Sequence, residues 1–147
     1  MPRTLTDAAA PPPRPLSQQE RAFRVMIRNA MWRRVELVAR DDLGGLTSVE
    51  ETSVERFDPP REVVMTRQAW DAAIGDYYAE HDSVGTDSDA HGPDLFVVEQ
   101  TGRRWPVRQT IADPSGHHDW VIEAEVDVDA SDELGELVLT TTAMRRL

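Results

Sequence analysis

The chain has 147 residues, 39% of them hydrophobic, which is enough for one domain with a core. It has no cysteine and no lysine, which excludes disulfides, thiolate metal sites, Schiff-base chemistry and the phosphate-binding lysine of P-loop ATPases. Of the net charge of −11, residues 1–40 carry +5 (eight arginines against three acids) and the remainder −16 (eight against 24), so nucleic-acid contact is expected only near the N-terminus.

No apolar run approaches the ~20 residues that span a bilayer, and the N-terminus lacks the apolar segment of a signal peptide. We therefore expect a cytoplasmic protein without membrane contact. Residues 1–16 are rich in proline and predict an extended linker or tail. Residues 17–147 are expected to form a single domain.

A long helix is predicted over residues 17–42. Ser17 is expected to be its N-cap, with Glu20 completing a capping box, and Gly44 and Gly45 are expected to end it. Apolar residues at three- and four-residue intervals define its buried face. They are Phe23, Met26, Ile27, Ala30, Met31, Leu37 and Val38.

Arginines occupy two sides of this helix. Arg34 falls within the apolar face, where it either forms a structural ion pair with a carboxylate or points into a pocket and holds an anion. The opposite face is either solvated or contacts a nucleic acid or protein partner. The candidate contact residues there are Arg21, Arg24, Arg28, Trp32 and Arg33.

Residues 46–65 are polar, are interrupted by Pro59-Pro60, and predict a variable segment with a short helix and a loop. A second helix is predicted over residues 66–82, capped by Thr66. Its apolar residues recur at helical spacing. They are Trp70, Ala73, Ile74, Tyr77 and Tyr78.

An antiparallel sheet is predicted over residues 94–146, because the hydrophobic period changes there from helical to alternating. The strands are expected in DLFVVEQ, RRWPVRQTIAD, WVIEAEVDVD and LVLTTTAM, with ASDELGE as a turn. Pro106 indicates an edge position or a bulge. The acidic residues from Glu123 to Asp129 are expected on a solvated face, with Arg104 and Arg108 as cross-strand partners.

Helices followed by antiparallel strands predict an α+β domain, with two helices packed on a curved sheet of about four strands. By analogy, a long helix lying in such a sheet favours a cone-shaped nuclear-transport-factor-2-like (NTF2-like) or cystatin-like fold. In such a cone the pocket lies between helix and sheet. It would be lined by Arg34, Tyr77, Tyr78, His81 and Trp120, with His81 as a general base.

The turns also contain side chains that could bind a metal. They are His81, Asp82, His91, His117, His118 and Asp119. Their spacing matches no standard site, so we predict no metal and no cofactor. Ser115 lacks a nucleophile elbow, and no catalytic residue is assigned.

Three segments together resemble a known family: RAFRVMIRNAMWRRVELVARDD, DYYAEHDSVGTDSDAHGP and RRWPVRQTIADPSGHHDWVIEAEVDVDASDELGE. They resemble the uncharacterised C-terminal domain of actinobacterial superfamily II helicases of the DEAD/DEAH-box type. The resemblance covers residues 21 to about 140, apart from 46–65. In that family the domain follows the two motor domains across a proline-rich linker, which PPPRP would fit.

This chain has no Walker A motif and no DEAD/DEAH box, so the resemblance implies an accessory domain and not ATP-dependent unwinding. It would be a separated piece of a helicase or a free-standing paralogue. The predicted function is a non-catalytic module in RNA or DNA metabolism that contacts the helicase motor domains or guides nucleic acid. The alternatives are an NTF2-like protein that binds or isomerises a small molecule around Arg34, and a homodimer that buries the outer face of its sheet.

Overall fold

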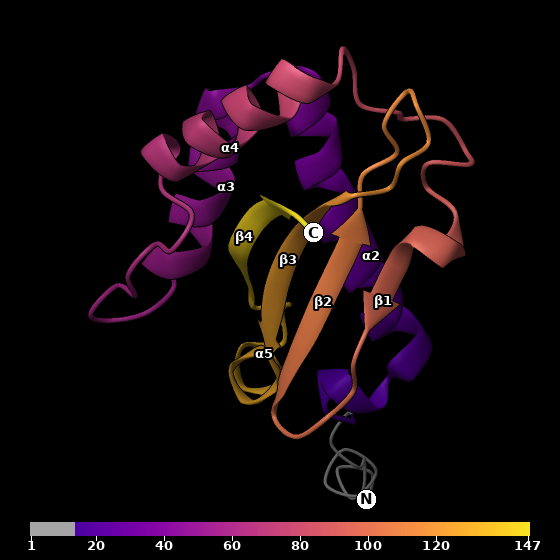
Figure 1. The fold of residues 1–147 in the computed structure, drawn as a ribbon. Helices are drawn as coiled ribbons and strands as arrows, with labels where there is room; N and C mark the ends of the chain where they lie inside the picture. Colours follow the sequence, from indigo (N-terminus) through magenta and orange to yellow (C-terminus); the bar gives the residue numbers. More distant parts are fainter. Residues whose placement is uncertain (1–13) are drawn as a thin grey trace, which may run out of the picture.

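The computed structural model describes residues 14–147, so most of the predicted linker lies outside the described residues. Leu16 already belongs to the core, so the domain begins slightly earlier than expected. In chain order the elements are η1 (Leu16–Gln18), α2 (Glu20–Ala39), α3 (Leu43–Glu55), α4 (Arg67–Glu80), η2 (Pro93–Leu95), β1 (Phe96–Val98), β2 (Arg104–Thr110), β3 (Trp120–Asp127), α5 (Val128–Leu134) and β4 (Leu139–Arg146) (Figure 1). No helix within residues 14–147 is long and apolar enough to cross a membrane.

The predicted α+β class is confirmed. The four strands form one open antiparallel sheet in the order β1-β2-β3-β4. In Figure 1, α2 runs behind the sheet, and α3 and α4 lie side by side next to β4. The core lies between these helices and the inner face of the sheet, and its largest fully buried side chains include Phe23, Trp70, Tyr77 and Ile122.

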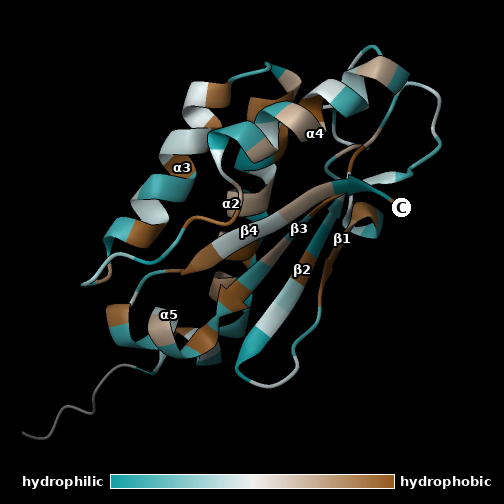
Figure 2. Cartoon of the chain, turned by 60° about the vertical axis from the view of Figure 1, so that its left-hand side comes forward, coloured by the Kyte–Doolittle hydropathy of each residue, from teal (hydrophilic) through white to brown (hydrophobic). Residues whose placement is uncertain are grey.

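The burial of residues along β2 alternates as predicted, and Figure 2 shows a hydrophobic segment of this strand between hydrophilic ones. On its outer face, Arg104 pairs with Glu125 at 3.0 Å and Arg108 with Glu123 at 3.2 Å, as predicted. Pro106 lies opposite the end of β1, and its carbonyl accepts the N–H of Glu99. Because proline has no N–H, it cannot return a bond to the carbonyl of Glu99, and β1 ends at Val98, one residue before this pair.

The predicted capping box of the first helix is wrong. Helix α2 begins at Glu20, and its N-cap Gln19 makes no side-chain cap. Ser17 lies in η1, where its N–H and its hydroxyl each donate to the carboxylate of Asp132 at 2.7 Å. Ser17 therefore bonds to Asp132, 115 residues away in the sequence, and does not cap the first helix as its local spacing predicted.

The two glycines expected to end the first helix lie inside the next one. Helix α2 ends at Ala39, and the carboxylate of Asp42 caps α3 by accepting the N–H of Gly45 at 2.8 Å. A Cβ at position 45 would lie 2.7 Å from a methyl carbon of Leu37, so the close approach of α3 to α2 favours glycine there. Helix α4 begins as predicted, with Thr66 accepting the N–H of Ala69.

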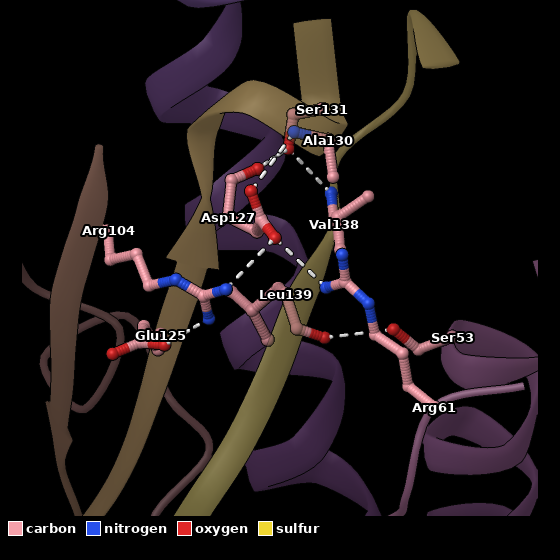
Figure 3. A network of polar contacts seen from close by, with 9 residues as sticks. All are labelled: Ser53, Arg61, Arg104, Glu125, Asp127, Ala130, Ser131, Val138 and Leu139. Atoms are coloured by element: carbon pink, nitrogen blue, oxygen red, sulfur yellow. Dashed lines mark hydrogen bonds and ion pairs between the residues drawn. The ribbon is translucent and has the colours of Figure 1, made fainter. Parts of the chain in front are cut away.

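The segment ASDELGE was expected to be a turn, but it lies mainly in helix α5. Asp127 caps this helix, because its Oδ1 accepts the N–H of Ala130 at 3.0 Å, while its Oδ2 accepts from Arg61 at 2.9 Å (Figure 3). The hydroxyl of Ser131 donates to the carbonyl of Asp127 and accepts the N–H of Val138. Asp127 is therefore buried and does not continue the solvated strand face.

Candidate functional site

The exposed residues of α2 from Arg21 to Arg33 form a surface that we call the α2 outer face. They are Arg21, Ala22, Arg24, Val25, Met26, Asn29 and Arg33. No acidic residue occurs between Arg21 and Arg33, and the side chains of Val25 and Met26 are 51% and 38% exposed. The α2 outer face therefore combines positive charge with apolar surface, and arginine and methionine are enriched in protein interfaces.

Two of the five predicted contact residues lie against the chain itself. Trp32 stacks on His91, with ring centroids 4.1 Å apart and planes inclined by 13°. The Arg28 guanidinium donates to the carbonyl of His91. Burial, together with the positive charge of Arg28, lowers the pKa of His91 below its usual value of 6.5. Arg28 and Trp32 thus hold the segment before η2 against α2 and are half-buried.

The other three predicted contact residues remain exposed. The Arg24 guanidinium lies 5.6 Å from the ring centroid of Phe96, a cation–π distance, on the side of α2 that faces β1. Arg33 lies on the other side of α2. It lines a groove of about 630 Å³ between α2, α3 and the segment that joins α5 to β4. Val49 and Leu137 provide apolar parts of that groove. Arg56 also lines the groove and, like Arg33, is exposed.

Arg34, at the inner side of the same groove, forms the structural ion pair that was one of its two predicted roles. Its Nε lies 3.3 Å from Oε2 of Glu50 and donates to the hydroxyl of Thr141 at 2.6 Å. That hydroxyl in turn donates to Glu50 at 2.8 Å. Burial acts to lower the pKa of Arg34, and the charge of Glu50 opposes this effect. The pair joins α2, α3 and β4.

The other predicted pocket residues form an aromatic cluster around Tyr77. The Tyr77 ring lies 5.2 Å from His81 and 5.6 Å from Trp120, centroid to centroid. Its hydroxyl donates to the Ser83 carbonyl, while that of Tyr78 donates to the Val38 carbonyl. The polar contacts of Arg34 are instead with Ala30, Glu50 and Thr141. The structure thus brings Tyr77, His81 and Trp120 together and places Arg34 in a different group of contacts.

A cluster of titratable side chains surrounds His81, which closes α4. The His81 side chain is only 5% exposed. Its Nδ1 lies 3.7 Å from Oδ2 of Asp113, and its Nε2 lies 3.5 Å from Oδ1 of Asp119. The His117 ring lies 5.9 Å from the His81 ring, and ligand atoms of His81, Asp113 and His117 fall within 4.8 Å of one another. These three residues could hold a metal ion.

The loop between β2 and β3 fixes the position of Asp113. The carboxylate of Asp113 accepts the N–H groups of Ser115, His117 and His118 at 2.8–3.1 Å. Burial alone would raise the pKa of Asp113, but these N–H donors and the nearby His81 hold it below its usual value of 3.8. The carboxylate is therefore a pre-oriented anion at neutral pH.

The set of possible ligands predicted from the sequence included His81, His117 and Asp119 but missed Asp113. The only local signal is its position four residues before the His117-His118 pair in a turn between two strands, where aspartate commonly accepts backbone N–H groups. Of the other residues weighed as ligands, His91 stacks on Trp32, and Asp82 and His118 are exposed outside the group formed by His81, Asp113 and His117.

Comparison with known proteins gives a family. The sequence model of the family described as domain of unknown function (DUF3516) matches residues 2–144, almost the whole chain. No curated protein and no solved structure matches the chain. The cone-shaped, NTF2-like arrangement therefore remains a prediction.

Proposed function

This chain belongs to the DUF3516 family, and we propose that it is a non-catalytic accessory domain that docks on the motor domains of a cytoplasmic superfamily II DEAD/DEAH-box helicase. The helicase part of the proposal comes from the sequence resemblance. The observation that carries the docking surface is the α2 outer face, where exposed arginines flank the exposed side chains of Val25 and Met26.

The composition of this face favours a protein partner over direct binding of nucleic acid. Only three arginines of the predicted contact set are exposed, and residues 41–147 carry a net charge of −16 that repels phosphate. Exposed valine and methionine add little to phosphate binding but supply apolar area to a protein interface. The helicase itself would act on RNA or DNA, while the exposed Arg21 and Arg24 would contact the motor.

A binding measurement with the purified helicase motor from the same cell tests this proposal. The double variant Arg21→Glu/Arg24→Glu should bind the motor at least about tenfold more weakly, which corresponds to about 1.4 kcal/mol. Arg67→Glu, an exposed arginine on α4, is the matched control and should bind like the unmodified chain. No binding by the unmodified chain, or equal loss in both variants, would contradict the proposal.

A second candidate function is binding of a small anionic or apolar molecule in the groove beside Arg34. The favouring observation is that Arg33, Arg34 and Arg56 all line that groove. Because Glu50 already neutralises Arg34, the exposed Arg33 and Arg56 would supply the positive charge. A metabolite that raises the melting temperature of the unmodified chain, but not that of Arg33→Ala/Arg56→Ala, would support this function.

A further inference from the structure

We infer that His81, Asp113 and His117 form a binding site for a divalent transition metal such as zinc, a site that is independent of the docking proposal. Two imidazoles and one carboxylate are the donor set of open, three-ligand zinc sites. Magnesium and calcium prefer sites made entirely of oxygen atoms, and the chain has no thiolate to offer softer metals.

The His81 side chain is buried, and neither ring nitrogen makes a hydrogen bond to the carboxylate that it faces. Its side chain is only 5% exposed, and within residues 14–147 its Nε2 has no hydrogen-bond partner. Its Nδ1 is 3.7 Å from the nearest carboxylate oxygen of Asp113, too far for a hydrogen bond. With Nε2 facing Asp119, the Nδ1 atom beside Asp113 is the ring nitrogen left to bind a metal.

The spacing of the donor atoms fits a metal site. Two ligand atoms at ~2.1 Å from a tetrahedral metal lie about 3.4 Å from each other. The separation of 3.7 Å between Nδ1 of His81 and Oδ2 of Asp113 is close to that length. A ligand atom of His117 lies within 4.8 Å of ligand atoms of His81 and Asp113, and rotation of this exposed side chain toward them would complete three ligands.

The groups behind the ligands are also arranged as they are in metal sites. Histidines that bind a metal through one nitrogen usually donate the other N–H to a carboxylate. Asp119 Oδ1 faces Nε2 of His81 at 3.5 Å, and Arg146 holds the other oxygen of Asp119 at 3.3 Å. This order of groups leaves the lone pair of Nδ1 on the side of Asp113. A carboxylate oxygen of Glu80 also lies within 4.8 Å of a ring nitrogen of His81, but Glu80 is paired with Arg146, so we place the metal on the Nδ1 side.

Zinc binding to the full, untagged chain tests the inference by competition with a chromophoric chelator. The unmodified chain should take up one zinc ion, and His117→Ala should lower the affinity at least about tenfold. His118→Ala is the matched control, because His118 is the exposed neighbour outside the group, and it should change the affinity less than about twofold. Cobalt(II) in place of zinc should give the visible absorption of a four-coordinate site in the unmodified chain and in His118→Ala only.

Both variants of this test replace exposed residues, so neither disturbs the core. His117 is exposed, so its replacement leaves the core intact, and circular dichroism of the variant checks this. Absence of stoichiometric zinc uptake by the unmodified chain overturns the inference. So does an affinity that His117→Ala leaves unchanged, or one that His118→Ala lowers as much.

Discussion

The Nε atom of Arg34 lies 3.3 Å from Oε2 of Glu50, and both side chains are almost fully buried where α2, α3 and β4 meet. Thr141 bonds to both members of the pair, so the two charges are compensated within a small polar network. Removal of one partner would leave the other charge buried alone, which is far less favourable than an apolar pair of similar size.

Arg34→Met should therefore lower the free energy of unfolding by about 3–5 kcal/mol, and Arg34→Met/Glu50→Leu should restore most of that loss. Urea unfolding at pH 7 measures both. Arg145→Met, which breaks an exposed ion pair with Glu123, is the control and should have little effect. A double variant less stable than Arg34→Met would show that the pair is not the source of the loss.

Tyr77 and Tyr78, the two tyrosines of the chain, should both resist ionisation in alkali. Burial raises the pKa of both above the usual value of 10.0, and Asp113 adds to the effect at Tyr77. Because the folded state favours the neutral phenol, this contribution to stability is complete below pH 10 and is lost as the pH rises further. Tyrosinate absorbance should therefore increase only as the protein unfolds. A simple titration of either tyrosine near pH 10 in the folded protein would contradict this prediction.

Asp127→Ala should lower the free energy of unfolding by about 1–2 kcal/mol at neutral pH, because it removes the cap of α5. Although burial opposes it, the N–H of Ala130 and the charge of Arg61 lower the pKa of Asp127 from its usual 3.8. The stabilisation is therefore complete above pH 3.8 and is lost as the pH falls through the lower pKa of the folded state.

Denaturant unfolding at several pH values measures this. The difference in free energy of unfolding between the unmodified chain and Asp127→Ala should become smaller in acid. Asp129→Ala is the control, since Asp129 is exposed and pairs only at the surface with Arg103. An equal effect of both substitutions would rule out the capping role.

His91 should report on the contact with Arg28. Its pKa is lowered by burial and by the positive charge of Arg28, so Arg28→Gln should raise it toward 6.5. Arg24→Gln, one turn earlier on α2 and in contact with Phe96, should leave it unchanged. Nuclear magnetic resonance (NMR) titration of the imidazole measures this. A His91 pKa unaffected by Arg28→Gln would mean that the two groups do not interact in solution.

The predictable parts of this fold are those whose partners lie close in the sequence. The cap at Thr66, the alternation of β3 and the cross-strand pair of Arg108 with Glu123 each follow from local spacing. The ambiguity of Arg34 was also visible, because a permanent charge in an apolar face must find a partner. The sequence contains 27 acidic residues, and nothing in their spacing indicates that Glu50 is the partner of Arg34.

The parts that could not be predicted depend on distant contacts. Ser17 is a good local cap, but Asp132 binds it from the other end of the chain. The alternation of β3 continues into Val128, which hides the start of α5. The cluster around His81 joins the end of α4 to the loop between β2 and β3, so only the packing of the helix on the sheet reveals it.

The docking proposal is tested most directly by the NMR signals of methionine methyl groups when the helicase motor is added. Met26 lies on the α2 outer face, whereas Met31, Met65 and Met144 are buried in the core. We expect the Met26 signal to shift or broaden in the complex, with the buried methionines unchanged and with the effect lost in Arg21→Glu/Arg24→Glu. A complex that leaves the Met26 signal unchanged would contradict the assignment of this face, and the absence of any complex would contradict the proposed function.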